Sequence, residues 1–107
     1  MYTLFRVGDK EYRLKLTTTQ IMRLEKVTGH HPLAILTGAI DDIPSVTNMV
    51  QVLYCSMVEL NHGISMSDVY HIFDAWLDEG HTTSDFLEIM IEIYEVSGLL
   101  PRTTEKN

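Results

Sequence analysis

Lysine and arginine are scarce in this chain, and most of its length contains neither. The 107 residues hold 8 Lys and Arg against 15 Asp and Glu, which gives a formal net charge of −7. Six of the basic residues lie in residues 1–26, whereas residues 27–101 contain eleven acidic residues and no basic one. Such a surface repels nucleic acid phosphates, so we expect no nucleic acid partner. It favours solubility and partners with basic surfaces.

Cysteine and long apolar runs are also lacking. With one cysteine, Cys55, no internal disulfide is possible, and the apolar residues around it predict a small core side chain. No apolar stretch approaches the roughly 18 residues that a transmembrane helix needs. The first residues have neither the basic start nor the apolar stretch of a signal peptide. We therefore expect no membrane partner and a reducing, cytoplasmic location.

The sequence has no recognisable motif for catalysis or metal binding. Its five histidines show no HExxH spacing, and there is no CxxC pair for zinc. No GxSxG elbow, P-loop or GxGxxG stretch occurs. We expect no metal, no cofactor and no catalytic residues, and interpret the chain as a binding protein rather than an enzyme. The alternative, a small enzyme or a regulator of one, requires a pocket with titratable groups of perturbed pKa.

Apolar and polar side chains alternate in the first sixteen residues, which is typical of β-strands. A turn motif, Gly8-Asp9-Lys10-Glu11, separates residues 2–7 from residues 12–16, and the pattern predicts a β-hairpin. A lone hairpin is only marginally stable in water, so it must pack on the rest of the chain or pair with another chain. The hairpin is therefore our candidate for self-association, which would build rings or open filaments by adding to a neighbour's strand edge.

Helical periodicity begins at residue 17, with capping residues before the predicted helices and a glycine after each. The predicted helices cover residues 17–28, 32–37, 45–61, 65–79 and 82–97. The helix at 45–61 has two apolar faces, which predicts a central position. The expected fold is α+β and mostly α, an N-terminal β-hairpin followed by four to five helices packed as a small bundle. Residues 1–101 are expected to form a single domain (hairpin 1–16, helices 17–101), and residues 102–107 a flexible tail.

The last predicted helix carries the most informative pattern. Three glutamates lie on one stripe at i, i+4 and i+7, and no Lys or Arg offsets them. The rest of this helix is apolar on almost every side, which is more apolar surface than one small domain usually covers. The candidate partner-binding residues are Leu87, Glu88, Ile91, Glu92, Tyr94 and Glu95. The alternative interpretation is a central core helix with one hydrated stripe.

A resemblance to a known family covers residues 10–101. It follows the order of the elements and three short stretches, which are Leu24-Glu25 before Gly29, Asn61-His62-Gly63-Ile64-Ser65, and Val96-Ser97-Gly98 before Pro101. The chain resembles the tail assembly chaperones of long-tailed, siphovirus-like phages and prophages of Gram-positive bacteria. None of these stretches is a catalytic signature, so the resemblance concerns the fold and the family.

The resemblance implies a role in virion assembly. Such chaperones bind the tape measure protein, a long apolar helical chain, and keep it soluble until tail tube protein polymerises around it. They act in the host bacterial cytoplasm and are generally absent from the finished virion. The resemblance therefore implies the tape measure protein as a partner, with tail tube protein as a further one. A phage head–tail connector or tail-completion protein, which stays in the particle, is the alternative.

Overall fold

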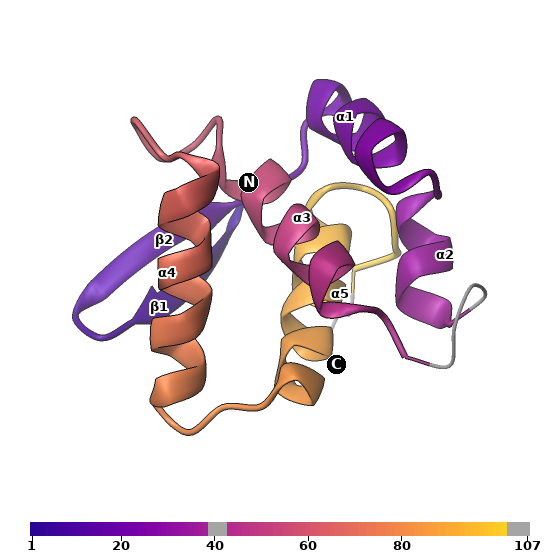
Figure 1. Cartoon of the computed structure of the whole chain (residues 1–107). Coiled ribbons are helices and arrows are strands. Elements are labelled where there is room, and N and C mark those ends of the chain that lie inside the picture. Colours follow the sequence, from indigo (N-terminus) through magenta and orange to yellow (C-terminus); the bar gives the residue numbers. More distant parts are fainter. Residues whose placement is uncertain (39–42, 103–107) are drawn as a thin grey trace, which may run out of the picture.

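A two-stranded antiparallel hairpin precedes five α-helices in the part of the chain that the computed structural model describes, residues 1–38 and 43–102 (Figure 1). The elements are β1 (Thr3–Val7), β2 (Lys10–Leu14), α1 (Thr18–Thr28), α2 (Pro32–Thr37), α3 (Val46–Met57), α4 (Met66–Asp78), the 3-10 turn η1 (Thr83–Asp85) and α5 (Phe86–Val96). The predicted α+β, mostly α fold is confirmed. Residues 39–42, between the second and third predicted helices, and residues 103–107 of the predicted tail lie outside the described residues.

The hairpin turn is shorter than the sequence predicts. Val7 pairs directly with Lys10, so only Gly8 and Asp9 form the loop, and β2 begins two residues before the predicted strand. Gly8 has φ +62°, while no residue other than glycine has a positive φ in the described residues. This combination fits a type II′ turn, which places glycine at its first central position and matches the twist of paired strands. The four-residue turn predicted at residues 8–11 was therefore wrong.

Side-chain caps set the starts of the helices, as predicted. Thr17 Oγ1 accepts a hydrogen bond from the backbone N–H of Gln20 before α1. Before α4, Ser65 and Asp68 form a complete capping box, in which each side chain accepts from the other residue's backbone N–H. Thr82 and Asp85 form a second box, but it opens η1, so the α-helical part of the last predicted helix starts only at Phe86.

The C-terminal end of α3 also differs from the prediction. The helix ends at Met57 rather than at Asn61, and the chain then turns toward the hairpin. The Asn61 side chain explains this turn. Its Nδ2 donates to the carbonyl oxygens of Met57 (2.9 Å) and Arg13 (2.7 Å), and its Oδ1 accepts from the Arg13 N–H (3.1 Å). These bonds fasten the end of α3 to β2, a long-range contact that helical periodicity does not encode.

One hydrophobic core joins the hairpin to the helices. Helix α3 lies centrally, with α4 on one side and α1 and α2 on the other (Figure 1), which confirms the predicted position. Phe86 is the hub of an aromatic cluster, with its ring centroid 5.4 Å from that of Phe73, 5.8 Å from Trp76 and 6.3 Å from Phe5. Such ring pairs add about 0.5–1.5 kcal/mol each beyond area burial. The cluster therefore ties β1 to α4 and α5.

Candidate functional site

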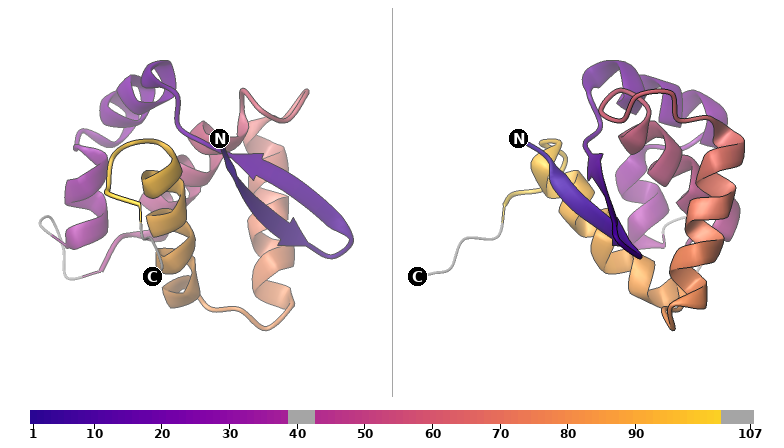
Figure 2. Two further views of the ribbon diagram at one scale, coloured as in Figure 1. Left: turned by 180° about the vertical axis from the view of Figure 1, so that it is seen from behind. Right: turned by 90° about the vertical axis from the view of Figure 1, so that its left-hand side faces the viewer.

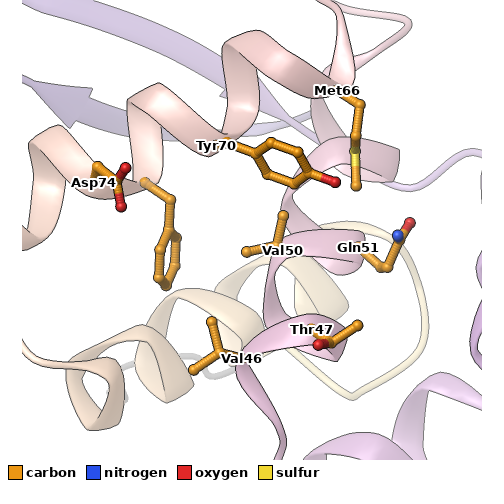
Figure 3. A pocket seen from close by; sticks show the side chains of 8 residues that line it. Val46, Thr47, Val50, Gln51, Met66, Tyr70 and Asp74 are labelled. Atoms are coloured by element: carbon orange, nitrogen blue, oxygen red, sulfur yellow. The ribbon is translucent and has the colours of Figure 1, made fainter.

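A groove lined mostly by apolar side chains lies between α3 and α4 and is one of several hollows of similar volume on the described surface. It has a volume of about 340 Å³. Its lining residues are Val46, Thr47, Val50 and Gln51 from α3 and Met66, Tyr70, Phe73 and Asp74 from α4. The pairs spaced by four residues lie on the same face of each helix. The two faces therefore meet across the groove, as Figure 3 shows.

Exposed apolar side chains line this groove, which we call the α3–α4 groove. Tyr70 is 53% exposed and Val46 is 49% exposed. Tyr70 and Met66 approach the groove from α4, and Val46 and Val50 approach it from α3 (Figure 3). Phe73, which is almost fully buried, closes the hollow toward the aromatic cluster. Apolar atoms are thus open to solvent on two neighbouring helices, a geometry suited to covering an apolar segment.

The groove has a polar border and one carboxylate. Thr47 and Gln51 line it along α3, and Asp74 lines it along α4. Side chains of this kind orient a bound apolar segment through hydrogen bonds at its rim, while the apolar part of the groove contributes most of the affinity. The arrangement therefore suits non-covalent recognition of a partly apolar helix or strand.

Residues with shifted pKa values lie elsewhere in the molecule. Burial raises the pKa of the Cys55 thiol to about 11, against a smaller lowering by the charge of Arg23. Burial likewise raises the pKa of the Tyr94 hydroxyl. Hydrogen bonds from the Ser65 backbone and side chain lower the pKa of Asp68. These shifts belong to core packing and a helix cap, because none of the three titrating groups lines the α3–α4 groove.

Residues 1–38 and 43–102 contain no group of three or more His, Cys, Asp or Glu side chains placed to hold one metal ion. The helices in these ranges are all too short or too polar to cross a membrane. Cys55 is fully buried, as its place in an apolar run predicts.

The candidate residues predicted on the last helix differ in their exposure to solvent. Ile91 is 39% exposed, Leu87 is half-buried, and Glu88 and Glu92 are exposed. Glu92 also accepts a hydrogen bond from Thr3 Oγ1 at 3.0 Å, so it contacts β1. Glu95 is half-buried. The stripe of glutamates therefore faces outward along most of α5, with Ile91 beside it.

Tyr94, unlike Ile91, does not lie on an exposed face of α5. The side chain is fully buried, and its hydroxyl donates to the carbonyl oxygen of Pro32 at 2.8 Å. The short helix α2 packs on α5 and covers the side on which Tyr94 lies. The core interpretation of the last helix thus holds for Tyr94.

Sequence reasoning missed the α3–α4 groove. Val46 lies at the first turn of α3, on the same side as the buried residues Met49 and Val50, yet it stays 49% exposed. The informative residue is Tyr70, which borders the apolar side of α4, four residues after Met66 and three before Phe73.

The chain belongs to a protein family whose function is not known. A family model described as "Family of unknown function (DUF6096)" matches residues 2–107, almost the whole chain. Neither a curated protein nor a solved structure gives a match. The family match spans the hairpin and all the described helices, so the α3–α4 groove lies within the family's shared region.

Proposed function

We propose that this protein is a phage or prophage tail assembly chaperone that binds an apolar helical segment of the tape measure protein in the α3–α4 groove. The observation that carries the proposal is the exposure of Tyr70 and Val46 on two adjacent helices that form one apolar groove. A long apolar helical client offers rows of side chains at i, i+3, i+4 and i+7, which dock in such grooves.

The charge of the chain supports the same role. The groove lies within residues 27–101, which contain no basic residue and eleven acidic ones. Client complexes loaded with this chain would all carry the same negative charge. They would therefore repel one another and stay in solution. The proposal places the protein in the host bacterial cytoplasm during tail assembly and gives it no catalytic step.

Burial of apolar surface supplies the binding energy in this proposal. Each Å² of apolar surface removed from water contributes roughly 25 cal/mol, before the entropy of association is subtracted. Large aromatic residues at the centre of an interface commonly contribute about 2 kcal/mol or more on truncation. Tyr70 is the aromatic residue of the groove that is exposed in the free protein, so it is expected to be the main anchor.

Co-expression with the tape measure protein encoded near it, followed by size-exclusion chromatography with light scattering, tests the proposal. We expect the two chains to co-elute and the tape measure protein to stay soluble. If the tape measure protein precipitates while this chain elutes alone, the chaperone proposal is overturned. Detection of the chain in purified virions would then favour the head–tail connector or tail-completion alternative.

Two matched variants locate the binding face. Tyr70→Glu places a charge in the α3–α4 groove, and Ile91→Glu places the same charge on the exposed side of α5. Both positions are exposed on helices, so circular dichroism should show a folded chain in each case. We expect only Tyr70→Glu to lose the tape measure protein. Loss in Ile91→Glu alone would move the binding face to α5.

A further inference from the structure

The rest of the chain forms hydrogen bonds with one outer edge of the hairpin and leaves the other edge open. The outer edge of β2 is covered at Arg13, because the Asn61 side chain bonds both the N–H and the C=O of that residue, as a neighbouring strand would. On β2, within the described residues, only Glu11, next to the turn, keeps outward backbone groups without a partner. Past the end of β2, the N–H of Lys15 donates to the Ser56 carbonyl oxygen at 2.9 Å. Covering an exposed strand edge in this way prevents other chains from pairing with it.

The outer edge of β1 is open. In a two-residue hairpin with Val7 paired to Lys10, alternate residues direct their backbone N–H and C=O away from the partner strand. On β1 these residues are Leu4 and Arg6, and the bonds of Arg13 opposite Leu4 agree with this pattern. Within the described residues, the outward backbone groups of Leu4 and Arg6 have no hydrogen-bond partner. Leu4 is 41% exposed and Arg6 is exposed, so solvent reaches this edge.

A strand added beyond β1 would extend the sheet over an acidic surface. Strand β2 packs on α3, whereas β1 packs on α4 and α5, and the hairpin lies over the space between these two helices (Figure 2). Thr3 at the start of β1 already contacts Glu92 of α5. A shallow hollow beside it is lined by Trp76, His81, Asp85, Glu88, Ile89 and Glu92. Its three carboxylates are exposed.

We propose that the open edge of β1 binds an extended, basic segment of a partner protein as a third strand. The outward N–H and C=O groups of Leu4 and Arg6 require an extended backbone, as in other cases of strand addition. Because side chains alternate across a strand, every second residue of the segment faces α5. Lys or Arg at those positions meets Glu88 and Glu92, which no basic residue of α5 offsets. This site is separate from the α3–α4 groove and does not depend on the proposed function.

Charge argues against a second copy of this chain as the occupant. Because Asn61 occupies the outward groups of Arg13 on β2, the longer open edge for pairing two copies is β1 to β1, which is a two-fold arrangement. Since α5 packs on the β1 side of the hairpin, this arrangement brings the two α5 helices to the same side of the joined sheet. The exposed Glu88 and Glu92 of both copies would then approach each other. A basic strand meets the same carboxylates with the opposite charge.

A capped seven-residue peptide of alternating lysine and valine is the probe, and its binding is measured by calorimetry on the full chain. Leu4→Pro removes one outward N–H without removing a hairpin bond, since Leu4 does not donate to β2. Leu4→Ala is its control, because it shortens the same side chain but keeps the N–H. We expect Leu4→Pro to weaken peptide binding at least tenfold and Leu4→Ala to weaken it less than threefold. Amide hydrogen exchange at Leu4 and Arg6 should slow when the peptide binds.

Two further measurements can overturn the proposal. A peptide of alternating glutamate and valine should not bind, and equal binding of the two peptides would contradict the charge argument. Light scattering without peptide should show a monomer. A dimer that Leu4→Pro dissociates would instead assign the β1 edge to a second copy of the chain. If Leu4→Pro leaves peptide binding unchanged while its far-ultraviolet circular dichroism matches the parent chain, strand addition at β1 is excluded.

Discussion

Helices α4 and α5 both pack on the hairpin, yet the helix with more apolar residues leaves less apolar surface exposed. Helix α5 is apolar on almost every side, yet Phe86, Met90, Ile93 and Tyr94 are fully buried and Ile91 is its one large apolar residue that counts as exposed, at 39%. Helix α4 has a clear polar side, but that helix leaves Tyr70 more than half exposed beside a groove. The number of apolar residues in a helix therefore does not tell which helix has apolar surface to offer a partner. The exposed apolar surface of a helix depends on how many other elements pack against that helix.

Two tyrosines give the sharpest test of this comparison. Tyr94→Ala on α5 should lower the free energy of unfolding by about 3–5 kcal/mol, because it removes a fully buried aromatic side chain and leaves a cavity. Tyr70→Ala on α4 should change it by less than about 0.5 kcal/mol, because the side chain is largely in solvent. Urea unfolding followed by circular dichroism measures both. Equal losses would contradict the assignment of Tyr94 to the core and Tyr70 to the surface.

A smaller change tests the hydrogen bond that fastens α2 to α5. Tyr94→Phe keeps the ring but leaves the Pro32 carbonyl oxygen without its donor. We expect a loss of about 1–2 kcal/mol in the free energy of unfolding, since an unpaired buried acceptor costs about 1–3 kcal/mol. Tyr70→Phe is the matched control and should have no measurable effect. If Tyr94→Phe is also neutral, the hydroxyl contributes nothing to the packing of α2.

The weakest predicted effect concerns pH and the start of α4. Hydrogen bonds from Ser65 hold the pKa of Asp68 below its value in the unfolded chain. A carboxyl group whose pKa falls on folding stabilises the native state above its unfolded pKa, and this contribution disappears as the pH falls through the folded pKa. Asp68→Asn should therefore lose stability relative to the parent chain at neutral pH, and the difference should narrow in acid. Thermal unfolding across this range measures it, and a constant difference would contradict the capping role.

Local chemistry explains why much of the fold could be predicted. The Ser65–Asp68 capping box starts α4 at the predicted position, because the two side chains and the backbone groups they bond are three residues apart. Gly29 ends α1 in the left-handed region, with φ +76°, which glycine adopts without steric cost. These features depend on neighbours in sequence, so a pattern in the sequence is sufficient to find them.

Contacts between residues far apart in the sequence explain the features that the sequence did not predict. The end of α3 depends on Asn61 bonding to Arg13, which lies 48 positions away in the sequence. Contacts between distant elements also decide which candidate residues of α5 are exposed. Tyr94 and Ile91 are three residues apart on one apolar helix, and only the packing of α2 against α5 decides that one is buried and the other exposed. Periodicity describes the faces of a helix but cannot name the neighbour that covers each face.

The amino-acid sequence by itself determined the acidic charge, the absence of a disulfide, the order of hairpin and helices, and most of the places where those helices begin and end. Each of these follows from composition or from groups within a few residues of one another. Tertiary structure alone decided which apolar surface stays open. The α3–α4 groove and the uncovered edge of β1 exist because of where distant elements pack and stop, and burial is a property of those neighbours.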